Sequence, residues 1–205
     1  FSYLNPHAYA WGFVRTLPIY YFLFLVVTFR TFTAKDKQSI PNDWRIPCFL
    51  LLWLYFFFTT TQVTYLPDIA WQKFWNVTKI FIPFYFTWVL INTRKKLYYL
   101  ITTIGVSIGI VAVKGGIFAI LTGFSHRIYG PPNTQFEDNN QFAVAMLIAI
   151  PLILIWQKEI LNPLYKKLVL YAVPLIYIAS ISSWSRGALL TMVVLTAILI
   201  RHSKR

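Results

Sequence analysis

The chain alternates long apolar runs with short polar and charged stretches, and this pattern predicts a series of membrane-spanning helices. A helix needs about 20 mostly apolar residues to cross the hydrocarbon core of a bilayer. Seven runs approach this length, at residues 17–32, 46–64, 74–91, 97–122, 140–156, 168–181 and 185–200. A membrane β-barrel would instead show segments of about ten residues with alternating polarity. The sequence therefore predicts an all-α, polytopic membrane protein with about seven transmembrane helices.

The last two runs follow one another closely, and the residues between them predict a turn. A single helix from Leu168 to Ile200 would be about 50 Å long, which exceeds one bilayer crossing. Ser182, Ser183 and Ser185 lie in the middle of this stretch, and serine side chains compete for backbone hydrogen bonds. We therefore expect two helices separated near residues 182–185.

The composition agrees with a membrane location. Hydrophobic residues make up 58% of the 205 residues and charged residues 12%, whereas soluble domains are about 45–50% apolar. The net charge of +13 comes from basic residues that punctuate the apolar runs, which is typical of topology signals rather than of a nucleic-acid surface. We expect no nucleic-acid partner. The single cysteine, Cys48, cannot form a disulfide within the chain.

The basic residues predict an orientation. Thirteen fall on one set of loops and at the C-terminal end, namely Arg30, Lys35, Lys37, Arg45, Arg94, Lys95, Lys96, Lys158, Lys166, Lys167, Arg201, Lys204 and Arg205. Four fall on the opposite set, namely Arg15, Lys73, Arg127 and Arg186, while Lys79 and Lys114 lie within predicted spans. Cytoplasmic loops are enriched in Lys and Arg. The pattern therefore predicts a multi-pass protein with Phe1 outside and Arg205 in the cytoplasm.

The longest predicted outer segment, residues 123–139, concentrates polar side chains, and we call it the outer loop. Tyr129 begins a Tyr-Gly-Pro-Pro sequence, which predicts a stiff turn because proline fixes its own backbone. Asp138 or Asn139 can cap the fifth helix by accepting hydrogen bonds from its first amides. Glu137 and Asp138 are adjacent carboxylates that could hold Arg127 or orient a sugar hydroxyl.

Three cations are predicted on the outer side. Lys114 lies within a span, where a cation costs about 2.5–3.5 kcal/mol, so either it reaches the headgroups or it contacts a phosphate in a protein cavity. Gly115 and Gly116 leave room beside it for a ligand or for another backbone. Arg186 is either a headgroup anchor or a bidentate phosphate ligand. Together with Arg127, these residues could bind the two phosphates of a pyrophosphate.

Three motifs occur in order along the chain. They are Ser2-Tyr3-Leu4-Asn5-Pro6-His7 with Trp11-Gly12-Phe13, then Arg127-Ile128-Tyr129-Gly130-Pro131-Pro132 leading to Asp138-Asn139-Asn140-Gln141-Phe142-Ala143, then Ser185-Arg186-Gly187-Ala188. In these motifs the chain resembles the O-glycosylation ligases associated with exosortase A systems, within the O-antigen ligase and polysaccharide polymerase superfamily.

The resemblance implies a glycosyltransferase of the bacterial inner membrane with a GT-C-like helical fold. Such an enzyme takes a glycan from a polyprenyl-pyrophosphate carrier on the outer side and joins it to a hydroxyl of an acceptor protein or glycolipid. It also implies that residues 1–205 are one transmembrane domain in the N-terminal half of a longer protein. Family members carry a histidine, thought to activate the acceptor, after the position of Arg205, so the catalytic residue is not assigned here.

The resemblance implies roles for particular residues. Arg127 and Arg186 become candidate pyrophosphate or glycan contacts, and Asp138 and Asn139 become candidate orienting residues. Lys114, Glu137 and Tyr129 join them as substrate-binding candidates from the residue analysis above. No cluster of His, Cys and carboxylate side chains occurs at metal-ligand spacing in the sequence, so we expect neither a metal nor another cofactor.

Two other classes of function are compatible with parts of the pattern. The protein could be a non-catalytic membrane scaffold or an accessory subunit of a larger complex, in which the cations only anchor it in the membrane. It could also be a transporter of lipid-linked glycans. Transport favours polar residues along a path through both leaflets, whereas the unusual polar residues here gather on the predicted outer side.

Overall fold

The structure is a computed structural model, and it describes residues 3–6, 12–13, 17–34, 43–63, 65–132, 134 and 136–203. Several residues used above lie outside these ranges. They are Phe1, Ser2, His7 and Trp11 near the start of the chain, and the basic residues Arg15, Lys35, Lys37, Lys204 and Arg205.

The described residues form seven α-helices and no strand, which confirms the all-α prediction. The helices are α1 (Ile19–Thr33), α2 (Arg45–Gln62), α3 (Pro67–Leu90), α4 (Arg94–Leu121), α5 (Asn139–Glu159), α6 (Pro163–Ser182) and α7 (Arg186–Ser203). Each of the seven helices includes most of one predicted apolar run, and the turn expected near residues 182–185 separates α6 from α7.

Three of the helices, α4, α5 and α6, are long and apolar enough to cross a membrane by length and composition. The helix α1 is apolar but has only 15 residues. In α2 and α3 the apolar residues are interspersed with tryptophan, tyrosine and threonine, which are less hydrophobic than aliphatic side chains and favour the membrane interface. The structure therefore supports a membrane protein, while seven spans and a GT-C fold stay predictions.

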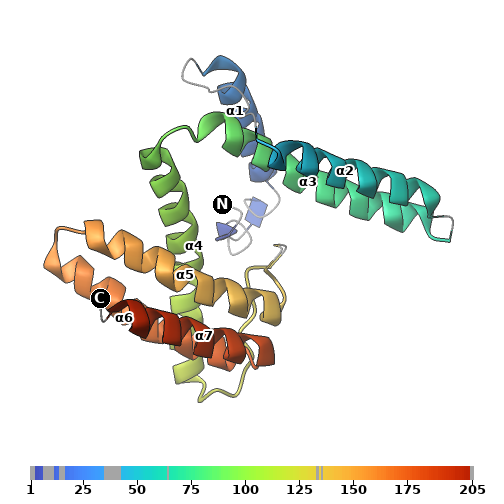
Figure 1. Ribbon diagram of the computed structural model, residues 1–205. Coiled ribbons are helices and arrows are strands. Elements are labelled where there is room, and N and C mark those ends of the chain that lie inside the picture. The colour runs from blue at the N-terminus through green and yellow to red at the C-terminus, as the bar shows by residue number, and fades with distance from the viewer. Residues whose placement is uncertain are drawn as a thin grey trace. The chain divides into compact units, whose positions relative to one another are not determined.

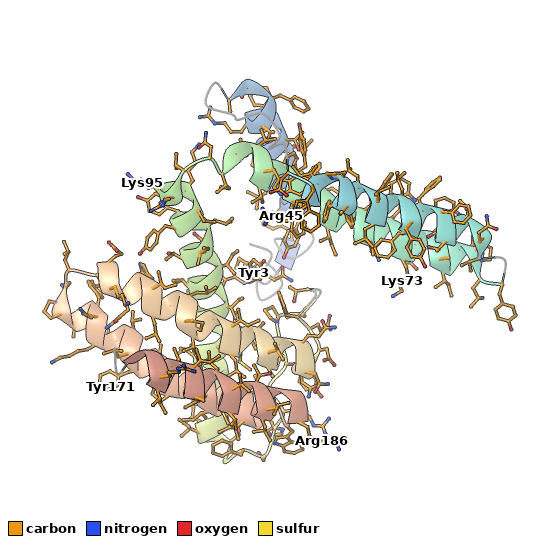
Figure 2. All side chains as sticks on the ribbon, viewed as in Figure 1. Tyr3, Arg45, Lys73, Lys95, Tyr171 and Arg186 are labelled. Atoms are coloured by element: carbon orange, nitrogen blue, oxygen red, sulfur yellow. The ribbon has the colours of Figure 1, made fainter. Side chains whose placement is uncertain are left out.

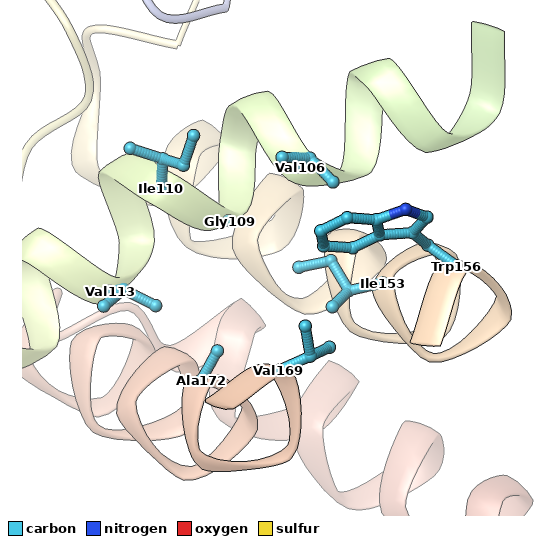
Figure 3. A pocket seen from close by; sticks show the side chains of 8 residues that line it. All are labelled: Val106, Gly109, Ile110, Val113, Ile153, Trp156, Val169 and Ala172. Atoms are coloured by element: carbon cyan, nitrogen blue, oxygen red, sulfur yellow. The ribbon is translucent and has the colours of Figure 1, made fainter. Parts of the chain in front are cut away.

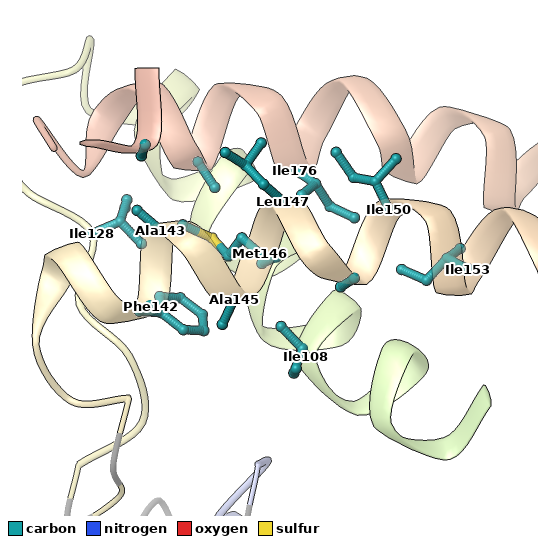
Figure 4. Close-up of a cluster of buried hydrophobic side chains, with 14 of the residues drawn as sticks. Ile108, Ile128, Phe142, Ala143, Ala145, Met146, Leu147, Ile150, Ile153 and Ile176 are labelled. Carbon is teal, nitrogen blue, oxygen red and sulfur yellow. The ribbon is translucent and has the colours of Figure 1, made fainter. Parts of the chain in front are cut away.

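The described chain divides into two compact units, one of residues 21–97 and the other of residues 1–20 and 98–205. In the second unit, α5 packs against both α6 and α7, and the three helices lie side by side (Figure 1). The core of this unit is formed largely by α5, whose Phe142, Met146, Leu147 and Ile150 are fully buried together with Ile176 of α6 (Figure 4).

The helix α4 crosses this layer steeply (Figure 1), and small residues allow the close approach. An ideal Cβ at Gly105 would lie 2.6 Å from Cβ of Leu152 in α5. One at Gly116 would lie 2.2 Å from the carbonyl oxygen of Leu175 in α6. Small residues in membrane helices commonly serve to bring backbones together.

In the unit of residues 21–97, α2 and α3 form a hairpin packed by aromatic side chains. The ring centroids of Phe49 and Phe81 are 4.1 Å apart. Trp53 Nε1 donates a hydrogen bond of 3.0 Å to Thr78 Oγ1. Before α2, the Asp43 carboxylate accepts hydrogen bonds from the backbone and the guanidinium of Arg45. These bonds and the positive charge lower the pKa of Asp43 to about 2.

Candidate functional site

The outer loop turns back onto the end of α6 directly after α4. Gly123 and Phe124 both adopt left-handed backbone conformations, with φ of 58° and 61°, and such residues commonly end a helix. The backbone N–H of Ile128 then donates to Ser182 O at 3.2 Å, and Ser182 Oγ donates to His126 O at 3.0 Å. Two hydrogen bonds therefore fix residues 126–128, including Arg127, against the last turn of α6.

The Tyr-Gly-Pro-Pro sequence forms a closed turn, as its prolines predict. The N–H of Gly130 donates to Glu137 O at 3.3 Å, and Pro131 is fully buried. An ideal Cβ at Gly130 would lie 1.7 Å from Phe136 O, so this position requires glycine. The side chain of Tyr129 is exposed. Glu137 thus contributes to the turn through its backbone carbonyl.

The first motif contacts the second one. Asn5 is 1% exposed, and its side-chain amide donates a short hydrogen bond to Pro132 O. Its Oδ1 accepts a hydrogen bond of 2.9 Å from the Tyr20 hydroxyl, and the ring of Tyr3 stacks on that of Phe136 at 5.6 Å. A buried amide with both ends satisfied specifies one arrangement of the groups around it. Asn5 therefore anchors the outer loop from a site 127 residues away in sequence.

Two neighbouring residues at the start of α5 have different roles. Asp138 Oδ1 accepts hydrogen bonds from the amides of Asn140 and Gln141, at 2.9 and 3.2 Å. Of the two caps that the sequence allows, Asp138 and Asn139, the structure shows Asp138. The buried side chain of Asn139 instead donates to Ser183 O at 2.8 Å. Asn139 therefore ties the start of α5 to the turn between α6 and α7.

That turn is held by its serines. Ser183 Oγ donates to Ser180 O at 2.6 Å and accepts from the N–H of Ser185. Ser185 Oγ accepts from the N–H of Ala188, so it caps α7. Trp184 takes a left-handed backbone conformation with φ of 57°. The sequence predicts these serines only as a helix break, whereas here they build the turn that presents Trp184 and Arg186.

Arg127 and Arg186 both lie near this turn. The guanidinium carbon of Arg127 lies 5.0 Å from the centroid of the Trp184 ring, a cation–π geometry. Two residues further on, Arg186 is the first residue of α7, and its side chain is exposed at that end of the helix (Figure 2). The possible ion pair between Arg127 and Asp138 is not formed, since the only salt bridge among the described residues joins Asp43 to Arg45.

Lys114 lies on an exposed face of α4 with Ile110 and Ile117. The space expected beside it is filled by protein, because an ideal Cβ at Gly115 would lie 3.0 Å from Ile128 Cγ2 and Gly116 lies against α6. Of the two uses predicted for these glycines, the structure shows the approach of protein. Through Gly115, the turn of α4 that carries Lys114 contacts the outer loop.

A cavity in this unit lies apart from the arginines. It has a volume of about 220 Å³ and is lined by apolar side chains of α4, α5 and α6, among them Val106, Ile153 and Trp156 (Figure 3). Within the described part of the chain, no three His, Cys, Asp or Glu side chains come together as a metal site would require.

Comparison with known proteins places the chain in a family but gives it no function. No curated protein and no solved structure matches it. Residues 2–161, which hold the first two motifs and helices α1 to α5, match a family described only as of unknown function, DUF5935. Because this match covers well over half of the 205 residues, the chain belongs to the DUF5935 family.

Proposed function

We propose that the protein is a membrane glycosyltransferase of the O-antigen ligase type. It transfers a glycan from a polyprenyl-pyrophosphate carrier to an acceptor hydroxyl on the outer side of the bacterial inner membrane. One observation carries the proposal: hydrogen bonds between the outer loop and the turn from α6 to α7 bring Arg127 and Arg186 to the same end of one unit.

Both arginines lie close to Trp184. Consecutive Cα atoms are 3.8 Å apart, so Cα of Arg186 lies within about 7 Å of Cα of Trp184. The guanidinium of Arg127 rests on the ring of that same tryptophan. Both arginine side chains are exposed, so a ligand can reach them. A guanidinium can donate two parallel hydrogen bonds to a phosphate, and two of them can serve the two phosphates of the carrier.

The proposed reaction is a displacement at the anomeric carbon of the glycan. The acceptor oxygen forms a new bond to that carbon, the bond to the phosphate oxygen breaks, and polyprenyl pyrophosphate leaves with the bonding electrons. The proton of the acceptor hydroxyl passes to a base or to water. Negative charge grows on the leaving pyrophosphate, and fixed cations stabilise such charge without reorganising. This is the role proposed for Arg127 and Arg186, while Asn139 positions the turn that carries Arg186.

A transfer assay tests the proposal. The intact gene product, reconstituted in vesicles with polyprenyl-pyrophosphate-linked glycan and an acceptor bearing free hydroxyls, is expected to form glycosylated acceptor and free polyprenyl pyrophosphate in equal amounts. Vesicles without the protein are the control. A correctly inserted protein that forms neither product under these conditions would instead support the scaffold alternative.

The predicted orientation can be tested by cysteine labelling. In a Cys48→Ser background, a membrane-impermeant maleimide added from outside should label Tyr129→Cys, because this exposed position lies in the outer loop. It should not label Lys166→Cys, which lies on the predicted cytoplasmic side. Asn133, at the centre of the outer loop, falls outside the described residues. Labelling at position 166 and not at position 129 would show that the orientation is the reverse of the proposed one.

A further inference from the structure

A second candidate site lies in the other unit, between the end of α2 and the start of α3. There a cavity of about 250 Å³ is bounded by Thr59 and Thr60 on α2 and by Ala70, Lys73 and Phe74 on α3. A water molecule takes up about 30 Å³ in the liquid, so the cavity equals about eight water volumes. This is smaller than the roughly 300–1,000 Å³ of pockets for drug-sized ligands. It suits a small polar group with part of a chain attached.

The walls of this cavity are held by aromatic contacts. Phe74 is 5% exposed, and its ring packs against those of Phe57 and Trp71 at 5.8 and 5.7 Å. The hydrogen bond between Trp53 and Thr78 joins the two helices further along the hairpin. The cavity is therefore formed before any ligand binds, which lowers the entropic cost of binding.

Lys73 supplies the only charge among the residues that line this cavity. Its side chain is exposed, and the one salt bridge in the described ranges joins Asp43 to Arg45. The nearest acid on the same helix, Asp68, is five residues away, which is not a spacing at which helical side chains face each other. No acidic side chain of the described hairpin therefore pairs with the Lys73 ammonium, which is open to an anion from outside the hairpin.

The two threonines add a preference for hydrogen-bond donors. Thr59 Oγ1 donates to the carbonyl of Tyr55 or Phe56, and Thr60 Oγ1 donates to Phe56 O at 2.7 Å. Their hydroxyl hydrogens are already used, but each oxygen keeps lone pairs that can accept. A ligand that matches this cavity has an anionic group for Lys73 and an N–H or O–H group for the threonines.

We propose that this cavity binds the headgroup of a phospholipid, with its phosphate on Lys73 and its amine or hydroxyl on Thr59 and Thr60. Trp71 and Trp75 flank the site on α3, and tryptophan is enriched at the depth of lipid headgroups. Val63 lines the cavity and is 42% exposed, so it can contact an acyl chain. Phosphatidylethanolamine and phosphatidylglycerol meet both requirements. Phosphatidylcholine lacks the donor. The inference depends on membrane insertion but not on glycosyl transfer.

Native mass spectrometry of the intact protein tests the inference. After equilibration with equal amounts of the three lipids in mild detergent, the protein should retain phosphatidylethanolamine or phosphatidylglycerol in preference to phosphatidylcholine. Lys73→Gln should weaken this retention about tenfold, because a charge-assisted hydrogen bond to phosphate is lost. Lys79→Gln is the matched control, since Lys79 is exposed on the same helix but does not line the cavity.

A second variant separates the cavity from the charge. Ala70→Leu fills part of the space while keeping Lys73, and it should also reduce lipid retention. Equal retention by the native protein and Lys73→Gln would overturn the inference, as would indifference to the three headgroups. A further arm adds inorganic phosphate. If phosphate alone displaces the lipid at equal concentration, the cavity is an anion site and the lipid assignment is wrong.

Discussion

Replacing Arg186 with alanine is expected to reduce the rate of glycan transfer by about 100- to 1,000-fold, the loss typical when one positioned group that stabilises developing charge is removed. Arg127→Ala should have an effect of the same order. Neither change should lower the abundance of the protein in the membrane. Arg186 is exposed at the start of α7. Arg127 and Trp184 are also exposed, and a cation–π contact at an exposed site contributes only about 0.5–1 kcal/mol.

The comparison needs variants that separate charge from geometry. Arg186→Lys keeps the positive charge but loses the two-pronged donor geometry, so its rate should fall between those of the native protein and Arg186→Ala. Arg201→Ala removes an exposed arginine from the far end of the same helix and should leave the rate unchanged. Native rates in both Arg127→Ala and Arg186→Ala would remove these residues from the site.

The double variant adds a test of whether both arginines act on one ligand. Groups that stabilise the same leaving group usually show non-additive losses. Arg127→Ala combined with Arg186→Ala should therefore be less damaging than the product of the two single effects. Fully multiplicative losses would indicate that the two guanidinium groups act independently, for example on different phosphates of separate lipids.

The helices could be predicted from the sequence because each depends on local physics. The separation of α6 from α7 follows from the length of one bilayer crossing, and the cap at Asp138 follows from its place before an apolar run. The distribution of basic residues predicts Arg127 and Arg186 on the same side of the membrane, but the contacts that bring both of them to one turn could not be predicted in this way. These contacts depend on the bonds of Ser182 and Asn139, which join segments 44 or more residues apart.

Asn5 is a clearer example of a contact that could not be predicted from the sequence. As one polar residue before a proline it indicates no partner, and its bond to Pro132 spans 127 positions. Only the burial of its amide between Pro132 O and the Tyr20 hydroxyl shows what the residue does. The role of the glycines in α4 could be predicted in part. Their small size predicts a close approach, but the sequence leaves open whether a ligand or another helix comes near.

Gly116→Ala is expected to destabilise the crossing of α4 over α6 by about 2–3 kcal/mol, within the range for overpacking. The added Cβ would lie 2.2 Å from the carbonyl oxygen of Leu175 and 2.9 Å from its carbonyl carbon. These are backbone atoms of a helix, so a change of side-chain rotamer cannot relieve the clash. The melting temperature in detergent should fall by roughly 4–12 °C. Gly187→Ala is the matched control, because the nearest atom to its Cβ is 4.0 Å away.

A rescue experiment distinguishes a backbone clash from a side-chain clash in the same helix. At Gly109 the added Cβ would meet Cδ1 of Ile153, at 2.5 Å. This atom is the end of a flexible side chain, so Ile153→Val should restore most of the stability lost in Gly109→Ala. Leu175→Ala should not restore Gly116→Ala, because the offending oxygen remains. Equal rescue at both positions would mean that α4 and α6 are not held backbone to backbone at Gly116.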